Sequence, residues 1–162
     1  MRHSPTEPDW SREEPRRFWD PSRRLLRAIR RYQAAGPLAR RYWVLSHRFW
    51  SMITQADIPL NTRIGGGLLL PHPNGVVIHP KSVIGPNCIL FQQATLGTTR
   101  NAEGAPVLGG DVFLGAGARV LGPVTIGDHA MVGANAVVMK DVAGGALAVG
   151  IPARIVDQAG TA

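Results

Sequence analysis

Residues 108–138 read LGGDVFLGAGARVLGPVTIGDHAMVGANAVV, and an aliphatic side chain returns at every sixth position of this stretch. A period of six fits neither an amphipathic α-helix nor an alternating β-strand. It is typical of hexapeptide β-helices, in which six extended residues form one face of a coil and three faces close it. The repeat therefore predicts a mainly β chain that winds as a parallel β-helix. The aliphatic positions of the repeat are Ile58, Ile64, Leu70, Ile78, Ile84, Leu90, Leu96, Leu108, Leu114, Val120, Ile126, Val132 and Val138.

Two irregularities interrupt the repeat. Its phase slips by two residues across 71–75, and between Leu96 and Leu108 one six-residue unit is replaced by residues 98–106. We expect both segments to leave the coil as loops, where binding groups tend to collect on a rigid scaffold. A coil of this width is filled by its own side chains, so we expect a ligand on an outer face or between subunits. The flat parallel faces also favour an oligomer.

The composition divides the chain into four segments. Residues 1–20 contain three prolines and are predicted to be a loose tail. Residues 21–56 are basic and carry apolar residues at helical spacing, which predicts a short α-helical segment of two helices separated by a Gly-Pro pair. The β-helix is expected over residues 57–156. Residues 157–162 are expected to form a short C-terminal tail.

Positive charge is confined to the first part of the chain. The formal net charge is +7, and residues 1–50 hold 12 arginines against five acidic residues, so the remainder is neutral. A basic arm can attract nucleic acid, an anionic membrane or a phosphate-bearing cofactor. We interpret it instead as a solvated helix face, with no nucleic-acid or membrane partner. No stretch approaches the roughly 20 apolar residues of a membrane span, and no apolar signal segment begins the chain, so we expect a cytoplasmic protein.

Six short motifs stand out against the repeat. They are DIP (57–59), IGGG (64–67), HPNGVVI (72–78), ATLGTT (94–99), GAGA (115–118) and GIPAR (150–154). With these motifs the chain resembles the serine acetyltransferase family of hexapeptide-repeat acyltransferases over about residues 38–156. The resemblance implies that the β-helix is left-handed and that the chain forms a homotrimer. It also implies acetyl transfer from acetyl-CoA to the hydroxyl of L-serine, which yields O-acetyl-L-serine for cysteine biosynthesis.

The resemblance also assigns roles to individual residues. His72 matches the general base of the family, and Asp57 matches the carboxylate that orients it. A histidine with a pKa of about 6.5 can accept the proton of a hydroxyl that attacks a thioester, so no covalent enzyme intermediate is needed. A carboxylate on the other ring nitrogen fixes the tautomer and stabilises the imidazolium ion. The residues that the resemblance places against the coenzyme are Gly97, Thr98, Thr99, Ala116, Ala134 and Arg154.

The chain departs from the family pattern around the expected acceptor site. It has Gly104-Ala105-Pro106 where the family usually carries Arg-His-Pro, and Pro71 where the family has aspartate. Arg100 or Glu103, in the same loop, are candidates to hold the acceptor instead. Two alternatives stay open: a sugar or polysaccharide hydroxyl as the acceptor and, outside enzymes, a trimeric binding module with a basic arm. The sequence ends without the isoleucine with which the family docks the sulfhydrylase, so no such partner is expected.

The remaining candidate groups are interpreted as structural. Cys88 occupies a small inward position of the repeat, which favours core packing over a role as a nucleophile. A zinc site needs a cluster of ligands, and the spacing of His72, His79 and His129 does not match that of hexapeptide carbonic anhydrases. We therefore expect no metal, and we expect His79 and His129 on the outside of the coil.

Overall fold

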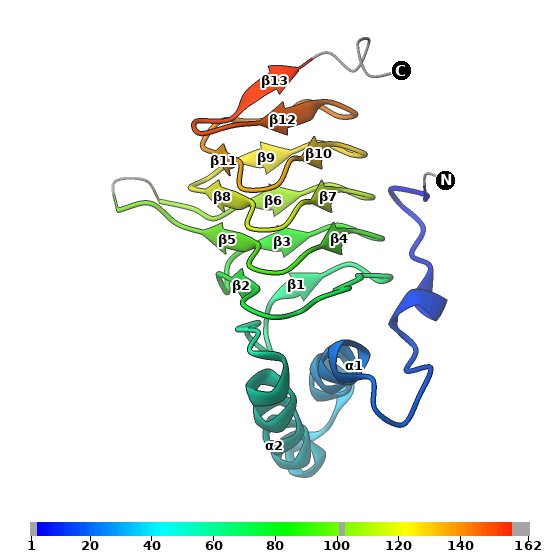
Figure 1. Cartoon of the computed structure of the whole chain (residues 1–162). Coiled ribbons are helices and arrows are strands. Elements are labelled where there is room, and N and C mark those ends of the chain that lie inside the picture. Colours follow the sequence, from blue (N-terminus) through cyan, green and yellow to red (C-terminus); the bar gives the residue numbers. More distant parts are fainter. Residues whose placement is uncertain (1–2, 101–102, 157–162) are drawn as a thin grey trace.

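The chain forms a three-sided stack of parallel β coils that stands on two α-helices (Figure 1). The computed structural model describes residues 3–100 and 103–156. Each side of the stack is a sheet of strands two or three residues long, which pair in parallel from one coil to the next. The mainly β chain with parallel sheets, preceded by a helical segment, is confirmed.

Three sheets make up the sides. The first sheet contains β1 (Arg63–Ile64), β3 (Val83–Ile84), β6 (Val107–Leu108) and β9 (Thr125–Ile126). The second contains β4 (Ile89–Leu90), β7 (Phe113–Leu114), β10 (Met131–Val132), β12 (Leu147–Val149) and an antiparallel edge strand, β13 (Arg154–Val156). The third contains β2 (Val77–Ile78), β5 (Thr95–Gly97), β8 (Arg119–Leu121) and β11 (Val137–Val138). The chain visits the three sheets in turn, so successive coils lie on top of one another.

The aliphatic residues of the repeat fill the inside of the coil. In the first sheet, Ile84 pairs with Leu108 and Leu108 with Ile126, and all three side chains are buried. Full burial of a side chain of this size contributes about 1.5–3 kcal/mol. The inward positions predicted from the six-residue period are therefore confirmed, although Ile64 is only partly buried.

The two helices close the base of the coil. They are α1 (Pro21–Ala34) and α2 (Pro37–Thr54), and each begins with a proline in its first turn, where the missing N–H costs no hydrogen bond. Leu25, Leu26 and Ile29 of α1 join the same buried cluster as Ile58 and Leu68 of the first coil. Because an open coil end would expose its core to water, α1 acts as the cap that stacked repeats require.

The outer face of α2 is apolar. Leu38, Tyr42, Leu45, Phe49 and Met52 recur at alternating steps of four and three residues, and all five are exposed. This spacing is typical of a helix that packs along another helix.

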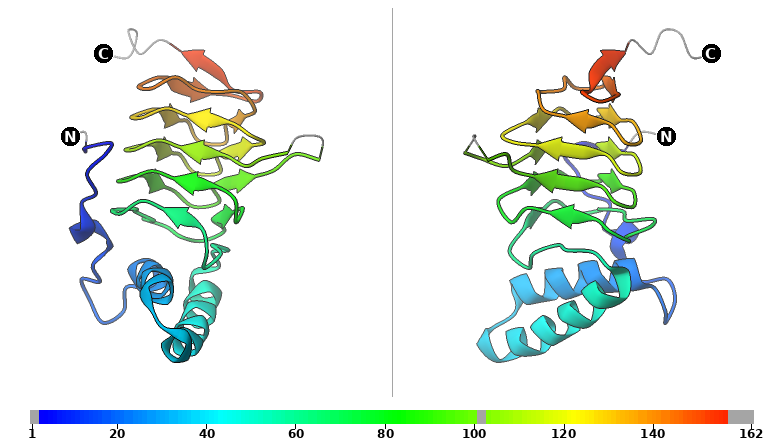
Figure 2. Two further views of the ribbon diagram at one scale, coloured as in Figure 1. Left: turned by 180° about the vertical axis from the view of Figure 1, so that it is seen from behind. Right: turned by 60° about the vertical axis from the view of Figure 1, so that its left-hand side comes forward.

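Residues 3–20, here called the N-terminal strap, run along one edge of the coil in every view (Figures 1 and 2). The side chain of Asn87 holds the strap, because its Oδ1 accepts from the Asp9 N–H at 2.8 Å and its Nδ2 donates to the carbonyls of Ser4 and Glu7, both at 2.8 Å. The expectation of a loose tail is therefore wrong for these residues. Side chain to backbone hydrogen bonds hold the strap, and such bonds need no periodic pattern of apolar residues. The sequence, read for that pattern, therefore contains no sign of an ordered segment.

A partly buried ion pair anchors the strap at Glu13. Glu13 lies in a short 3₁₀ helix, η1 (Trp10–Glu13), and its carboxylate accepts two hydrogen bonds from Arg30 of α1, at 2.8 and 3.0 Å. The same carboxylate accepts the Leu68 N–H at 3.1 Å, and Arg30 also donates to the carbonyl of Gly65 at 2.6 Å. Strap, helix and first coil are thus joined at one point.

Both irregularities of the repeat lie outside the regular coil. Residues 71–75 form a loop that leads into β2, and the segment after β5 projects from the stack (Figure 1). Residues 101–102, between the two described parts of this second loop, and the expected C-terminal tail, residues 157–162, lie outside the described residues. Within residues 3–100 and 103–156, neither helix combines the length and the hydropathy of a membrane span.

Candidate active site

His72 lies in the loop that the phase slip produces. The loop turns back at Gly75, whose φ of +68° is unfavourable for residues with a side chain, and the Gly75 N–H donates to the carbonyl of Gln55 at 3.0 Å. The His72 side chain is exposed, and its ring lies 6.2 Å from the ring of Phe91 in the next coil. The imidazole thus lies beside the outer surface of the coil, and in the part of the chain that the structure describes its nitrogens form no hydrogen bond.

Asp57 lies where the chain leaves α2 and enters the coil. Its backbone pairs with β2, because the Asp57 N–H donates to Val76 at 2.8 Å and its carbonyl accepts from Ile78 at 2.9 Å. The side chain is exposed, and in the described part of the chain no hydrogen bond joins it to His72. The expected Asp57–His72 pair therefore stays a prediction.

Backbone hydrogen bonds stack the His72 loop and two predicted coenzyme residues along one edge of the coil, here called the His72 edge. Gln93 N donates to Asn74 O at 2.8 Å, and in the next coil Gly117 N donates to Gln92 O at 2.9 Å. Asn135 N then donates to Ala116 O at 2.8 Å, which brings Ala134 into the same column. A long ligand lying along this edge would touch His72 at one end and the alanine turns at the other.

Three further predicted coenzyme residues lie on the adjoining sheet. Gly97 ends β5, and its carbonyl accepts from Gly122 N at 2.9 Å. The exposed Thr98 and partly buried Thr99 follow it at the start of the projecting loop.

Arg154 lies farther up the stack, in β13. It is exposed, and together with Lys140 it lines a cavity of about 310 Å³ at the C-terminal end of the coil. Two cations at one cavity make a chemically reasonable contact for phosphate groups.

The two predicted acceptor residues are not at this site within the single chain. Arg100 and Glu103 are exposed on the loop after β5, and neither lines the hollow around His72. The loop leaves the coil where the third sheet passes into the first, whereas His72 lies where the second passes into the third. Their role in holding the acceptor stays a prediction.

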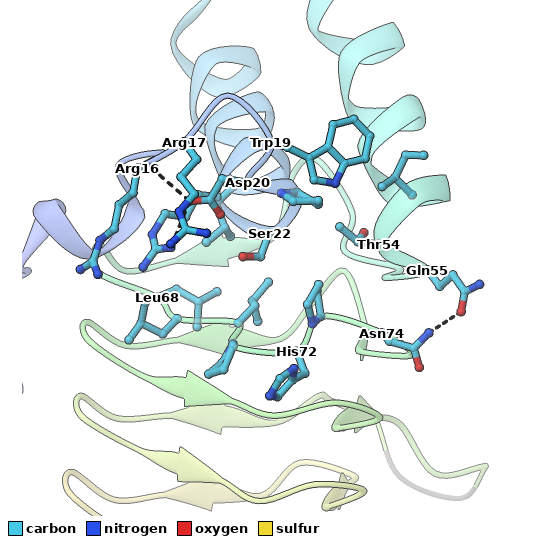
Figure 3. Close-up of a pocket in the computed structure, with 18 residues that line it drawn as sticks. Arg16, Arg17, Trp19, Asp20, Ser22, Thr54, Gln55, Leu68, His72 and Asn74 are labelled. Atoms are coloured by element: carbon cyan, nitrogen blue, oxygen red, sulfur yellow. Dashed lines mark hydrogen bonds and ion pairs between the residues drawn. The ribbon is translucent and has the colours of Figure 1, made fainter.

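A hollow of about 820 Å³ opens beside His72, between the strap, the two helices and the first coil (Figure 3). Figure 3 shows His72 on its lower side, Arg16 and Arg17 entering from the strap above, and Gln55 and Asn74 at one end, where their side chains are hydrogen-bonded. Backbone and side chain groups of different segments thus converge on one space next to the proposed base.

Sequence reasoning missed the arginines of the hollow. The excess of arginine in residues 1–50 is visible in the sequence, but a positive count does not say which guanidinium groups face a cavity. Only the path of the strap brings Arg16 and Arg17 to the His72 loop.

Cys88, His79 and His129 do not line the hollow beside His72. Cys88 is fully buried, its thiol donates to Gly109 O at 3.2 Å, and burial raises its pKa to about 12, so it is a poor nucleophile. His79 and His129 are partly buried, the first accepting from Lys81 N and the second 3.1 Å from Asp111 Oδ2. Over the described residues, no three His, Cys, Asp or Glu side chains gather as a metal site.

Known proteins that are similar to this chain belong to one family of transferases. The family model described as bacterial transferase hexapeptide (six repeats) matches residues 105–140. A serine acetyltransferase from Helicobacter pylori is 37% identical over 139 residues, which cover 82% of this chain and 81% of that protein. A serine acetyltransferase from Synechococcus elongatus is 37% identical over 131 residues, which cover 80% of this chain and 52% of that protein. The chain thus spans about half the length of some curated relatives it matches.

Solved structures that resemble this chain are also serine acetyltransferases. Soybean serine acetyltransferase complexed with serine superposes with a TM-score of 0.71 at 36% identity, covering 84% of this chain and 56% of that one. A serine acetyltransferase from Brucella abortus in complex with coenzyme A gives a TM-score of 0.77 at 29% identity, covering 91% of this chain and 62% of that one.

Proposed function

The chain belongs to the serine acetyltransferase family, and on that premise we propose that it transfers the acetyl group of acetyl-CoA to the hydroxyl of L-serine. The observation that carries the proposal is the position of His72, exposed beside a large hollow at the foot of the edge that Ala116 and Ala134 share. A base at this point lies between a space for a small acceptor and a long surface for a coenzyme. The relatives whose structures hold serine and coenzyme A support the choice of both substrates.

The proposed reaction is direct transfer. His72 accepts the proton of the serine hydroxyl while the oxygen attacks the thioester carbonyl carbon. The tetrahedral oxyanion that forms is stabilised by N–H donors. The C–S bond then breaks, the acetyl ester is left on the acceptor, and the coenzyme thiolate takes up a proton. Asp57 is proposed to orient the imidazole and to stabilise its charged form.

Coenzyme binding is proposed along the His72 edge. Ala116 and Ala134 would contact the long arm of acetyl-CoA there, and Arg154 would neutralise a phosphate. The stacking of the two alanine turns above the His72 loop supports this path. Gly97, Thr98 and Thr99 lie at the other end of the third sheet, so they would contact the coenzyme only across a subunit boundary. Arg100 and Glu103 would reach an acceptor only across a subunit boundary, so their role depends on the assembly.

The proposal also covers the oligomeric state of the chain and the handedness of its β-helix. We propose a homotrimer, which the exposed apolar face of α2 and the partly exposed Val77, Val107 and Met131 on the outer sheet faces support. The hexapeptide match supports a left-handed winding of the β-helix. The cytoplasmic location expected from the sequence stays a prediction.

Thiol release from acetyl-CoA tests the proposed function. The purified chain is expected to release thiol at a rate that saturates with L-serine, and faster than with a panel of neutral sugars. A rate with L-serine equal to background hydrolysis, together with saturable release with one sugar, would replace serine by that sugar as the acceptor. Background rates with all acceptors would instead favour the non-catalytic binding module.

A further inference from the structure

The hollow beside His72 carries positive charge that has no counterion within the described chain. Arg16 and Arg17 line it from the strap, and both side chains are exposed. The acidic residue in its lining, Asp20, is already engaged, because its Oδ2 accepts from Arg23 Nη1 and from the Arg16 N–H, both at 3.1 Å. Among residues 3–100 and 103–156, no acidic side chain pairs with either guanidinium group of Arg16 and Arg17. The hollow is therefore suited to a negatively charged ligand.

The position of the hollow favours the acceptor over the coenzyme as that ligand. Two of the residues proposed to bind acetyl-CoA, Ala116 and Ala134, lie along the His72 edge on the side away from the helices. The hollow lies on the opposite side of His72, against the strap and the ends of both helices (Figure 3). A thioester that reaches His72 from the coil side would meet an acceptor that enters from the helix side.

We propose that Arg16 and Arg17 bind a carboxylate of the acceptor and so select hydroxyl acceptors that carry one, an inference that rests on the proposed acetyl transfer at His72. A guanidinium group donates two parallel N–H bonds to a carboxylate, which fixes orientation as well as charge. The loop after β5 has Gly104-Ala105-Pro106 and offers no cation at those positions. Within one chain the strap therefore supplies the cations beside His72, whereas Arg100 would reach an acceptor only across a subunit boundary.

Two kinds of acceptor share this chemistry, a hydroxy amino acid and a sugar acid. The experiment therefore compares two matched pairs, L-serine with L-serinamide and D-glucuronate with D-glucuronamide, in which an amide replaces the carboxylate and the hydroxyl groups are unchanged. The full chain is expected to prefer the charged member of one pair, and that pair identifies the source of the carboxylate.

The decisive variant is Arg16→Gln/Arg17→Gln. It keeps the Arg16 N–H that bonds to Asp20 and removes both charges. We expect KM for the charged acceptor to rise by about tenfold or more, while kcat and KM for acetyl-CoA stay unchanged. KM for the uncharged member of the pair should not change. Arg16→Lys/Arg17→Lys should restore part of the preference because it restores the charge.

The matched control is Arg41→Gln/Arg48→Gln, which removes two exposed arginines of α2 that do not line the hollow. It lowers the net charge by the same amount and is expected to leave both KM values unchanged. A rise in KM in the control equal to that in the strap variant would overturn the proposal, because it would show a general effect of net charge. A selective rise in KM for acetyl-CoA would also overturn it and would assign the arginines to the coenzyme.

The design separates this inference from the proposed function. Transfer to uncharged acceptors with no preference for a carboxylate would overturn the inference while acetyl transfer stands. If no acceptor is acetylated, the proposed function fails, and binding of L-serine and D-glucuronate is then measured by isothermal titration calorimetry. Binding that the strap variant loses and the control keeps would support the anion site, and absence of binding of both would refute it.

Discussion

At the scale of single residues, an exposed histidine and a buried cysteine have opposite environments. His72 sits in a loop with its ring open to a ligand, whereas Cys88 is enclosed by the coil. The six-residue phase predicted both environments, because one residue falls at the slip and the other at an inward position. The sequence could not show whether Asp57 bonds to His72, because that depends on side-chain geometry.

Replacing His72 by alanine tests the general base. For His72→Ala we expect kcat to fall by at least about 10²-fold, because the attacking hydroxyl would lose its proton acceptor. KM for acetyl-CoA and the thermal unfolding midpoint should stay near those of the parent, since the side chain is exposed. His79→Ala, which removes another histidine of the same coil, serves as the control. A similar loss of kcat in both variants would remove His72 from the chemistry.

The buried thiol of Cys88 makes stability depend on pH at the alkaline end. Burial raises the pKa of the Cys88 thiol from 9.0 to about 12, so above pH 9 the unfolded chain releases a proton that the folded chain keeps. The free energy of unfolding should therefore fall as the pH rises through this window, by up to about 1.4 kcal/mol per pH unit from this group. Well below pH 9 the Cys88 thiol should not affect how the free energy of unfolding depends on pH.

Urea unfolding of the parent chain and of Cys88→Ala between pH 8 and pH 11 measures this contribution. Lysines and tyrosines titrate in both proteins, so the difference in slope isolates the thiol. Equal slopes would mean that the thiol ionises as readily in the folded chain as in the unfolded one.

At the scale of elements, the coil could be predicted from the sequence and the strap could not. The interior of the coil requires an aliphatic residue at every sixth position within each regular stretch from Ile58 to Val138. The fold can therefore be recognised from the sequence without knowledge of any contact. The strap buries little apolar surface and is held by Asn87 and by the Glu13–Arg30 pair. The Asn87 contacts are between side chain and backbone and join residues about 80 positions apart, and neither they nor the ion pair produce a periodic pattern in the sequence. The position of the strap could not be predicted, so the sequence showed an excess of arginines but not which of them line the hollow.

Asn87 offers a direct test of how the strap is attached. Asn87 has a φ of +60°, which glycine adopts freely, so Asn87→Gly removes the three side-chain bonds to the strap without straining the corner. We expect the Asp9 amide to exchange its hydrogen at least about tenfold faster, while amides within β4 and β7 are unaffected. Hydrogen exchange followed by mass spectrometry of residues 4–13 measures this. Unchanged exchange of the strap would show that Asn87 does not hold it.

At the scale of the whole molecule, the site lies where the helical base meets the coil. The helices and strap build the acceptor side, and the stacked turns of the coil build the coenzyme side. The apolar stripe on α2 and the partly exposed apolar residues on the sheet faces give this arrangement surfaces suited to association.

Light scattering coupled to size-exclusion chromatography tests the assembly. The chain is expected to elute with a mass of about 52 kDa, three times the 17.4 kDa of one chain. Leu45→Glu, which places a charge in the α2 stripe, should lower this mass, whereas Arg41→Glu on the same helix should not. A parent mass of one chain at micromolar concentration would contradict the proposed trimer.

Transfer of a labelled acetyl group tests whether this chain acetylates L-serine through His72. Acetyl-CoA carrying ¹³C in its acetyl group is incubated with L-serine and the chain, and the products are analysed by mass spectrometry. The account predicts labelled O-acetyl-L-serine that accumulates in step with free coenzyme A and nearly vanishes with His72→Ala. Label that remains on the coenzyme, appears only as free acetate, or reaches serine equally fast with His72→Ala would contradict it.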